Sequence, residues 1–242
     1  MRGQPPADEA ATLALLGEGE LEVVGRLTDA SNATFLCRVT KGESGTLAVY
    51  KPRRGERPLD DFPLGTLGNR ERAAYLLSEA STWDIVPPTI LRDGPLGPGM
   101  LQAWVETDPE ADVLEMVMTG DRRLRRVCLF DAIANNADRK GTHLLPVESG
   151  QVYGVDHGIC FNRDPKLRTV LWAWRGTEIV GDEIAVVRRV RASLDGTLGS
   201  ELAELLSDRE IQETIGRAQA LLDTCSFPEP DPNRPAIPWP PF

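Results

Sequence analysis

Three short apolar segments joined by turn-forming clusters constrain the fold more than any other feature of the chain. ELEVVGRL (20–27), ATFLCRVT (33–40) and TLAVYK (46–51) have strand-like patterns, and the clusters TDASN and KGESG lie between them. Connections this short place successive strands side by side in antiparallel order. The sequence therefore predicts an antiparallel meander in the first part of the chain.

After this meander the chain passes from strand patterns to helix patterns. Two further strands are predicted around the turn GPLGPG, at 86–93 and 99–106, and a short hairpin within 143–156. Apolar residues at helical spacing predict helices elsewhere, at 8–16, 69–81, 111–118, 121–136 and, within a helical region from about 165 onward, at 182–194, 198–206 and 208–224.

The order of these elements indicates the fold class and the division of the chain. Strands come first and helices dominate afterwards, so we expect an α+β protein with two lobes and a cleft between them. The small β-rich N-lobe would cover residues 1–106, and the mostly helical C-lobe would cover 107–227. The last segment, 228–242, is rich in proline, which excludes a helix and favours an extended tail.

Charge and composition exclude several classes of function. A formal net charge of −10 argues against broad nucleic-acid binding, which needs a basic face. No apolar run is long enough to form a transmembrane segment. The four cysteines lie far apart and the chain has only two histidines, so we expect neither a disulfide framework nor a His-rich metal site. These features favour a cytoplasmic protein.

Lys51 and Glu71 are the first pair of candidate site residues. Alternation along TLAVYK places Lys51 on the same face as Leu47 and Val49. Such a lysine commonly extends its charge into solvent at the end of a strand; alternatively, it points into a cleft and holds phosphate groups. The second interpretation requires an acidic partner. Glu71 is in position to provide it, although considered alone it would be a surface residue of the first helical turn.

Two aspartates form the second pair. Asp138 lies in NNADRKGTH (135–143), where two asparagines end the preceding helix, and Asp156 ends a strand in GVDHG (154–158). Each is a common turn residue when considered alone. As functional residues, Asp138 would accept a hydroxyl proton and Asp156 would bind Mg²⁺, which prefers oxygen ligands. The order of all four residues along the chain favours the functional interpretation.

That order resembles the protein-kinase-like fold. Protein kinases have a VAIK-type strand lysine, a helix glutamate, an HRD loop and a DFG motif, and the counterparts here are AVYK (48–51), Glu71, ADRKGTH (137–143) and DHG (156–158). The last two motifs are more similar to those of phosphatidylinositol 3- and 4-kinases, especially the type II 4-kinases. HipA-type kinases and secretory-pathway casein kinases share this layout. The whole chain also resembles actinobacterial proteins described as phosphatidylinositol kinase-like.

The resemblance implies an ATP-dependent phosphotransferase that uses Mg²⁺ or Mn²⁺. Lys51 would contact the α/β-phosphates of ATP and Glu71 would hold Lys51. Asp138 would be the catalytic base and Asp156 would bind the metal ion. Phosphoryl transfer consists mostly of positioning and charge neutralisation, which so small a set of residues can supply.

The resemblance also implies which residues bind the nucleotide. TDASNATF (28–35) would be the phosphate loop, and Trp104 to Glu106 the adenine hinge. The residues expected to contact ATP in these two segments are Ser31, Asn32, Thr34, Trp104, Val105 and Glu106. The phosphate loop lacks the GxGxxG pattern of protein kinases, and hydroxyl, amide and backbone groups would serve as donors in its place.

His143 departs most clearly from the kinase pattern. It lies five residues after Asp138, where a metal-binding asparagine is expected. Histidine is a poor ligand for Mg²⁺ and prefers softer metals. A Mn²⁺ ligand, an imidazolium that stabilises phosphate, a site for one metal ion and a plain surface histidine all stay open. The alternative function is therefore a nucleotide-binding pseudokinase or an adenylylating kinase-like regulatory protein.

The motifs do not fix the phosphate acceptor, because one fold can carry sites for many substrates. Protein, lipid and small-molecule hydroxyl groups are all candidates. The negative net charge argues weakly against an anionic bilayer. A protein acceptor is slightly preferred for a chain this short.

Overall fold

The strands of the first hundred residues form one antiparallel sheet. The computed structural model describes residues 9–27 and 32–242. The sheet has five strands in the order β1-β2-β3-β5-β4. Their bounds are Glu20–Leu27 (β1), Thr34–Lys41 (β2), Ser44–Pro52 (β3), Thr89–Gly94 (β4) and Gly97–Ala103 (β5). Because β2 pairs with both β1 and β3, the predicted meander is confirmed.

Helix α1 (Glu9–Glu18) packs on this sheet and completes a small apolar core. Its residue Leu16 is fully buried with Cys37 and Val39 of β2 and with Ala48 and Tyr50 of β3. Alternate positions along β2 and β3 point to the same face, which explains why these residues meet. Lys51 lies next to Tyr50 in sequence and therefore points to the opposite face of β3.

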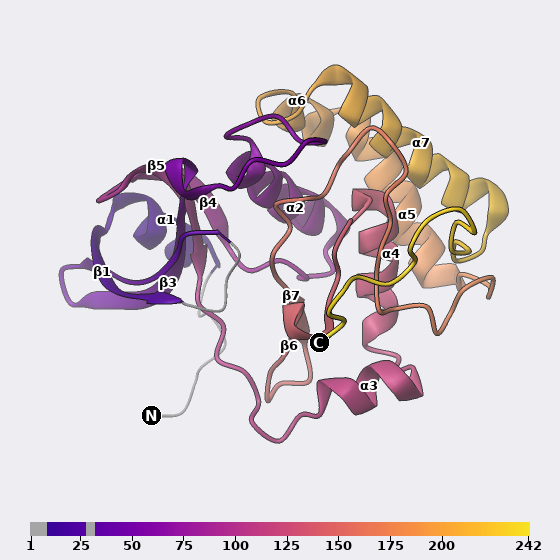
Figure 1. Cartoon of the computed structure of the whole chain (residues 1–242), viewed down its shortest axis with the longest axis horizontal. Helices are drawn as coiled ribbons and strands as arrows, with labels where there is room; N and C mark the ends of the chain where they lie inside the picture. Colours follow the sequence, from indigo (N-terminus) through magenta and orange to yellow (C-terminus); the bar gives the residue numbers. More distant parts are fainter. Residues whose placement is uncertain (1–8, 28–31) are drawn as a thin grey trace.

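Helix α2 (Leu67–Ser81) lies between the sheet and the later helices, as Figure 1 shows. It contacts β4 and β5 on one side and α5 and α6 on the other. Its buried residues include Arg70 and Glu71, which are both 1% exposed. A helix that packs on two sides has buried residues around most of its circumference, and charged groups among them need partners.

The remaining elements, together with α2, form the second and larger apolar core. Two short strands, β6 (Leu144–Pro146) and β7 (Val152–Gly154), pair as the predicted hairpin. The helices are α3 (Val113–Thr119), α4 (Leu124–Ala134), α5 (Gly181–Leu194), α6 (Thr197–Ala203) and α7 (Asp208–Thr224), with short 3-10 turns η1 (Arg53–Gly55) and η2 (Gly141–His143). No helix of the described residues is long and apolar enough to cross a membrane.

The prediction of helix from about residue 165 onward is wrong for the first part of that region. Residues 165–180 form no helix, and the segment runs beside the loop that carries Asp138. The amide of Arg139 donates to the carbonyl of Arg168, and the amide of Val170 donates to the carbonyl of Arg139. These backbone groups are bonded to another segment, so an internal helix is not needed to satisfy them.

The C-terminal tail packs along the same loop. As the proline content predicted, residues 228–242 form no helix. The carbonyl of Ala236 accepts from the amide of Thr169, and that of Pro241 accepts from the amide of Gly141. Figure 1 shows the chain end beside β6 and β7. The tail is therefore an extended strap over the segment 165–172 and the turn η2.

Candidate active site

A cavity of about 340 Å³ brings together the candidate residues of the two halves of the chain. Lys51 reaches it from the end of β3 and Glu71 from α2. Asp138 and Asp156 reach it from the loops that follow α4 and β7. The structure therefore places all four residues around one space, as the order along the chain predicted.

Lys51 lies at the centre of this group. Its Nζ is 2.6 Å from Oε1 of Glu71 and 2.8 Å from Oδ1 of Asp156. Burial opposes the charge of the ammonium group, but the two carboxylates outweigh it and raise the pKa of Lys51. The lysine is therefore protonated at neutral pH and held between an acid from each half of the chain.

Glu71 is a buried residue, not the surface residue that it would be if considered alone. Its side chain is 2% exposed. Oε1 accepts from Lys51, and Oε2 accepts from the amide of His157 at 2.9 Å. Both carboxylate oxygens are thus occupied, one by β3 and the other by the DHG turn. This residue fixes the turn relative to the sheet.

Asp156 has a strained backbone and a strongly acidic side chain. Its φ is 63°, which is rare for a residue other than glycine and costs roughly 1–2 kcal/mol. Lys51 lowers the pKa of the Asp156 carboxyl far below its ordinary value, with burial acting against it and His143 contributing less. The carboxylate is ionised and half exposed. Strained residues often occur where a fold directs a side chain at a ligand.

His143 lies beside Asp156 and is mostly buried. Its Nε2 is 3.4 Å from Oδ2 of Asp156, and its side chain is 13% exposed, which excludes a plain surface histidine. Burial lowers the pKa of His143 to about 4 against the pull of Asp156, so the ring is neutral at pH 7. An imidazolium that stabilises phosphate is therefore not supported at neutral pH. Nδ1 accepts a long bond from the amide of Lys140, which assigns the ring proton to Nε2.

Asp138 lies partly buried at the start of the loop that follows α4. Its amide donates to Oδ1 of Asn136 at 3.0 Å, which fixes the start of the loop. Oδ2 lies 3.3 Å from Nζ of Lys140. Burial raises the pKa of Asp138, and Asp156 adds to the increase, while Lys140 opposes both. A raised pKa brings a carboxylate closer to the value that suits a general base.

A fully buried polar cluster holds the two loops together. Arg139 donates to both carboxylate oxygens of Asp131 in α4, at 2.9 and 2.8 Å. Its other donors reach the carbonyl of Val155 at 2.9 Å and Nε2 of His157 at 2.6 Å. Burial and Arg139 keep the pKa of His157 well below its ordinary value, so this ring is a neutral acceptor. The cluster connects α4, the Asp138 loop and the DHG turn.

A signal for this cluster is present in the sequence but was missed. Asp131 lies seven residues after Leu124 and three after Cys128, on the apolar face of the predicted helix. A charged residue on such a face needs a buried partner. No role was predicted from the sequence for Asp131 or for the side chain of His157.

The predicted nucleotide-binding segments are only partly in the cavity. Asn32 lines it, and its Oδ1 accepts from the amide of Arg57 at 2.9 Å. Thr34 is buried and donates to the carbonyl of Asn32, so it supports the loop from outside the cavity. Ser31 lies outside the described residues. Arg57 also lines the cavity and was not predicted from the sequence, and Lys140 contacts Asp138 from outside the lining.

The predicted adenine hinge does not reach this cavity. Trp104, Val105 and Glu106 follow the end of β5, and none of them lines the cavity. The amide of Trp104 donates to the carbonyl of Leu47, and its indole N–H donates to Glu106 at 3.3 Å. The backbone N–H of Trp104 is therefore bonded to β3, and its indole N–H is bonded within the segment 104–106.

The carboxylates can hold a metal ion only with help from a ligand. No group of three or more His, Cys, Asp or Glu side chains in the described part of the chain is arranged for metal binding. Asp156 offers ionised oxygens toward the cavity, and Mg²⁺ typically takes one or two carboxylates, water and the phosphates of its substrate. The residues present therefore fit a nucleotide-bound Mg²⁺ and do not form an all-protein metal cage.

Comparison with known proteins gives a relative and a fold. The chain is 44% identical to protein Rv2133c of Mycobacterium tuberculosis (strain ATCC 25618 / H37Rv) over 264 aligned positions, which cover 95% of each chain. No protein-family model matches it. The crystal structure of the Golgi casein kinase superimposes with a TM-score of 0.54 and 13% identity, over 92% of this chain and 77% of that one. The proinflammatory kinase CtkA of Helicobacter pylori gives a TM-score of 0.45 and 12% identity, over 85% and 98%. The architecture is therefore kinase-like: an N-terminal antiparallel sheet followed by a mostly helical region.

Proposed function

Because the chain belongs to the family of protein Rv2133c and has a kinase-like fold, we propose that it is an ATP-dependent phosphotransferase. One observation carries the proposal. Lys51 bonds to both Glu71 and Asp156 in a cavity that Asp138 also lines. This arrangement supplies a cation for phosphate, an ionised carboxylate for a metal ion and a base for the acceptor, which are the parts that phosphoryl transfer requires.

Each residue then has one task in the proposed reaction. Lys51, held by Glu71, contacts the α/β-phosphates, and Asn32 and Arg57 contribute polar groups at the rim of the cavity. Asp138 takes the proton of the acceptor hydroxyl. At the same time the hydroxyl oxygen bonds to the γ-phosphorus of ATP, and the bond between that phosphorus and ADP breaks. Lys140 stays close to Asp138. Asp156 would hold Mg²⁺ or Mn²⁺, which would neutralise charge on the phosphates.

The test of this function is transfer of label from γ-³²P-ATP in the presence of Mg²⁺ or Mn²⁺. The full chain is incubated with cell lysate, with a lipid extract and with a small-molecule extract, and also alone. We expect label in one of these fractions, with protein slightly preferred as acceptor. If ATP is bound but neither consumed nor transferred with either metal, the chain is a nucleotide-binding pseudokinase. Transfer of labelled AMP from α-³²P-ATP would instead indicate an adenylylating protein.

His143→Asn is expected to lower the Mg²⁺ concentration needed for half-maximal nucleotide binding, by about tenfold. The Nε2 proton of His143 faces Asp156, so no ring lone pair is directed there, whereas an asparagine would offer an oxygen ligand. The measurement is a fluorescence titration of an ATP analogue at increasing Mg²⁺. The control is His143→Ala, which removes the ring and adds no ligand. Weaker Mg²⁺-dependent binding in His143→Asn than in wild type would show that His143 itself supports the metal.

A further inference from the structure

A second cavity lies under the C-terminal tail, apart from the candidate active site. Its volume is about 670 Å³, against about 340 Å³ for the cavity around Lys51, and no residue lines both. Its walls are α7, the segment 165–172 and the tail residues 226–236. Small-molecule sites commonly measure roughly 300–1,000 Å³. The space is therefore large enough for a ligand.

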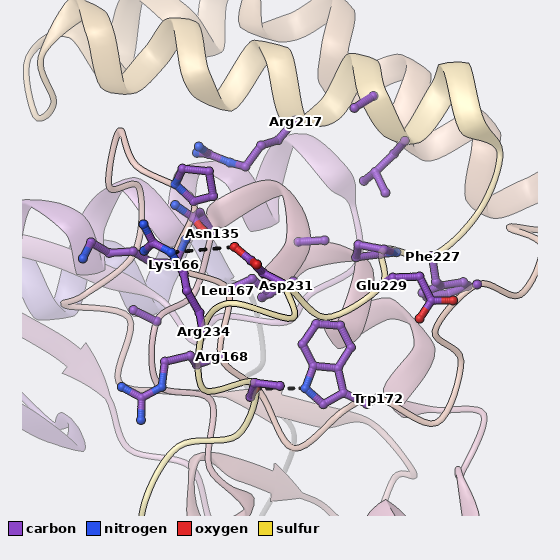
Figure 2. A pocket seen from close by; sticks show the side chains of 18 of the residues that line it. Asn135, Lys166, Leu167, Arg168, Trp172, Arg217, Phe227, Glu229, Asp231 and Arg234 are labelled. Carbon is purple, nitrogen blue, oxygen red and sulfur yellow. Dashed lines mark hydrogen bonds and ion pairs between the residues drawn. The ribbon is translucent and has the colours of Figure 1, made fainter.

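One side of this cavity is apolar. Trp172, Leu221 and Phe227 contribute to it, and Figure 2 shows Trp172 and Phe227 on the same side of the view. The indole N–H of Trp172 donates to the carbonyl of Ala236 at 2.9 Å, so the ring is attached to the tail. Its polar atom is already satisfied, which leaves the ring faces available for an apolar ligand.

The other side carries an excess of positive charge. In Figure 2, Lys166, Arg168, Arg217 and Arg234 lie opposite Trp172 and Phe227. Lys166 is paired with Asp61 at 2.7 Å, and Arg234 lies 3.7 Å from Asp231. Glu229 is the remaining carboxylate of the lining. Four cations therefore face three carboxylates, in a chain whose net charge is −10.

Two of these cations make no hydrogen bond or ion pair with a carboxylate among the described residues. The guanidinium of Arg168 makes no hydrogen bond or ion pair there and its Nε is buried, although its charge acts to lower the pKa of Asp138. Arg217 donates to the carbonyls of Ile133 and Asn162 and to Thr214, and to no carboxylate, although the charges of Glu213 and Glu210 act on it. Burial lowers the pKa of Arg217 to about 10, so it is still charged at neutral pH. A partly buried guanidinium without an anion lacks the stabilisation that a charged partner supplies.

We propose that this cavity is a binding site for a small amphipathic anion. The apolar body of the ligand would lie against Trp172, Leu221 and Phe227, and its carboxylate or sulfonate would pair with Arg168. Arg217 would add positive charge from the other end of the basic side. An uncharged ligand would leave the guanidinium of Arg168 without a hydrogen-bonded partner. A polyanion would be repelled by Glu229 and Asp231. Asn135 and Ala137 also line the cavity, so the ligand would lie behind the loop that carries Asp138.

The probe for this site is 1-anilinonaphthalene-8-sulfonate, an apolar ring system with one negative charge. Its uncharged analogue N-phenyl-1-naphthylamine is the matched comparison. Fluorescence titration of the full chain is expected to give one sulfonate per chain, with an affinity about tenfold higher than that of the analogue. An absence of saturable binding, or equal affinity for the two probes, contradicts the proposal.

Variants locate the probe and identify the cation. Ala220 and Thr224 line the cavity from exposed positions of α7, so Ala220→Trp and Thr224→Trp fill it without overpacking the core. Either change should weaken sulfonate binding at least tenfold, whereas Gln212→Trp, exposed on the same helix and outside the lining, should not. Two filling variants are used so that a failure of one to fold, detected by thermal melting, leaves the test intact. Binding that survives both would place the probe elsewhere.

The charge is tested separately. Arg168→Gln should weaken binding of the sulfonate about tenfold and leave the uncharged analogue unaffected. The control is Arg163→Gln, in which the side chain is 59% exposed, does not line the cavity and lies 4.0 Å from Asp164. Equal loss for both probes in Arg168→Gln would mean that the residue has only a structural role, and no loss in both Arg168→Gln and Arg217→Gln would overturn the anion assignment.

Discussion

Asp138→Asn should reduce ATP turnover by about 10²- to 10⁴-fold while leaving nucleotide affinity nearly unchanged. The amide has the same shape as the carboxylate, so the bond from Lys140 and the loop geometry are retained in large part. The amide cannot take up the proton of the acceptor hydroxyl. The measurements are steady-state ADP release and fluorescent-nucleotide binding, both at saturating metal.

The matched control for this change is Asp164→Asn. Asp164 lies in the nearby segment, its side chain is 54% exposed, and its ion partner Arg163 is 4.0 Å away. We expect wild-type turnover from it. Undiminished turnover in Asp138→Asn would remove Asp138 from the role of base. A wild-type chain that binds nucleotide and turns over none would instead favour the pseudokinase alternative.

Arg139→Met should lower the free energy of unfolding by about 3–5 kcal/mol. Arg139 and Asp131 are both 0% exposed, and the change leaves the carboxylate of Asp131 buried without its cation. It also removes the donor to His157 Nε2 and to the carbonyl of Val155. Small proteins are stable by about 5–15 kcal/mol in total, so this loss is a large fraction. Urea unfolding followed by tryptophan fluorescence measures it.

The control for this change is Arg163→Met, an exposed arginine for which we expect a change within about 0.5 kcal/mol. The double variant Asp131→Leu/Arg139→Met removes both charges and should recover part of the lost stability, because no buried charge stays unpaired. A loss below about 1 kcal/mol in Arg139→Met would show that water or another group compensates Asp131.

The meander and the helices could be predicted from the sequence because their signals are local. Alternation in β2 and β3 and the clusters between the first three strands fix which residues share a face of the sheet. The two asparagines after α4 end that helix as expected, with Asn135 at φ 53°. The helix prediction was wrong at 165–180, because the backbone groups of that segment bond to the Asp138 loop and to the tail.

The site was predicted in part. The order of a strand lysine, a helix glutamate and two loop aspartates indicated Lys51, Glu71, Asp138 and Asp156, since each motif has its own local context. The expected hinge at 104–106 is not at the cavity, because the position of a segment beyond β5 depends on how it packs. The state of His143 also could not be read from sequence, since burial beside Asp156 sets its pKa.

By itself, the sequence determined the order of strands and helices, the four charged residues proposed for the candidate site and the absence of helix in the tail. The tertiary structure alone decided that Glu71 is buried against Lys51 and the DHG turn, that Arg139 pairs with Asp131, and that the tail covers a second cavity. The physical reason is that ion pairing, desolvation and cavity shape depend on distances between segments far apart in the chain. Hydrophobic periodicity and turn chemistry depend only on neighbours in sequence.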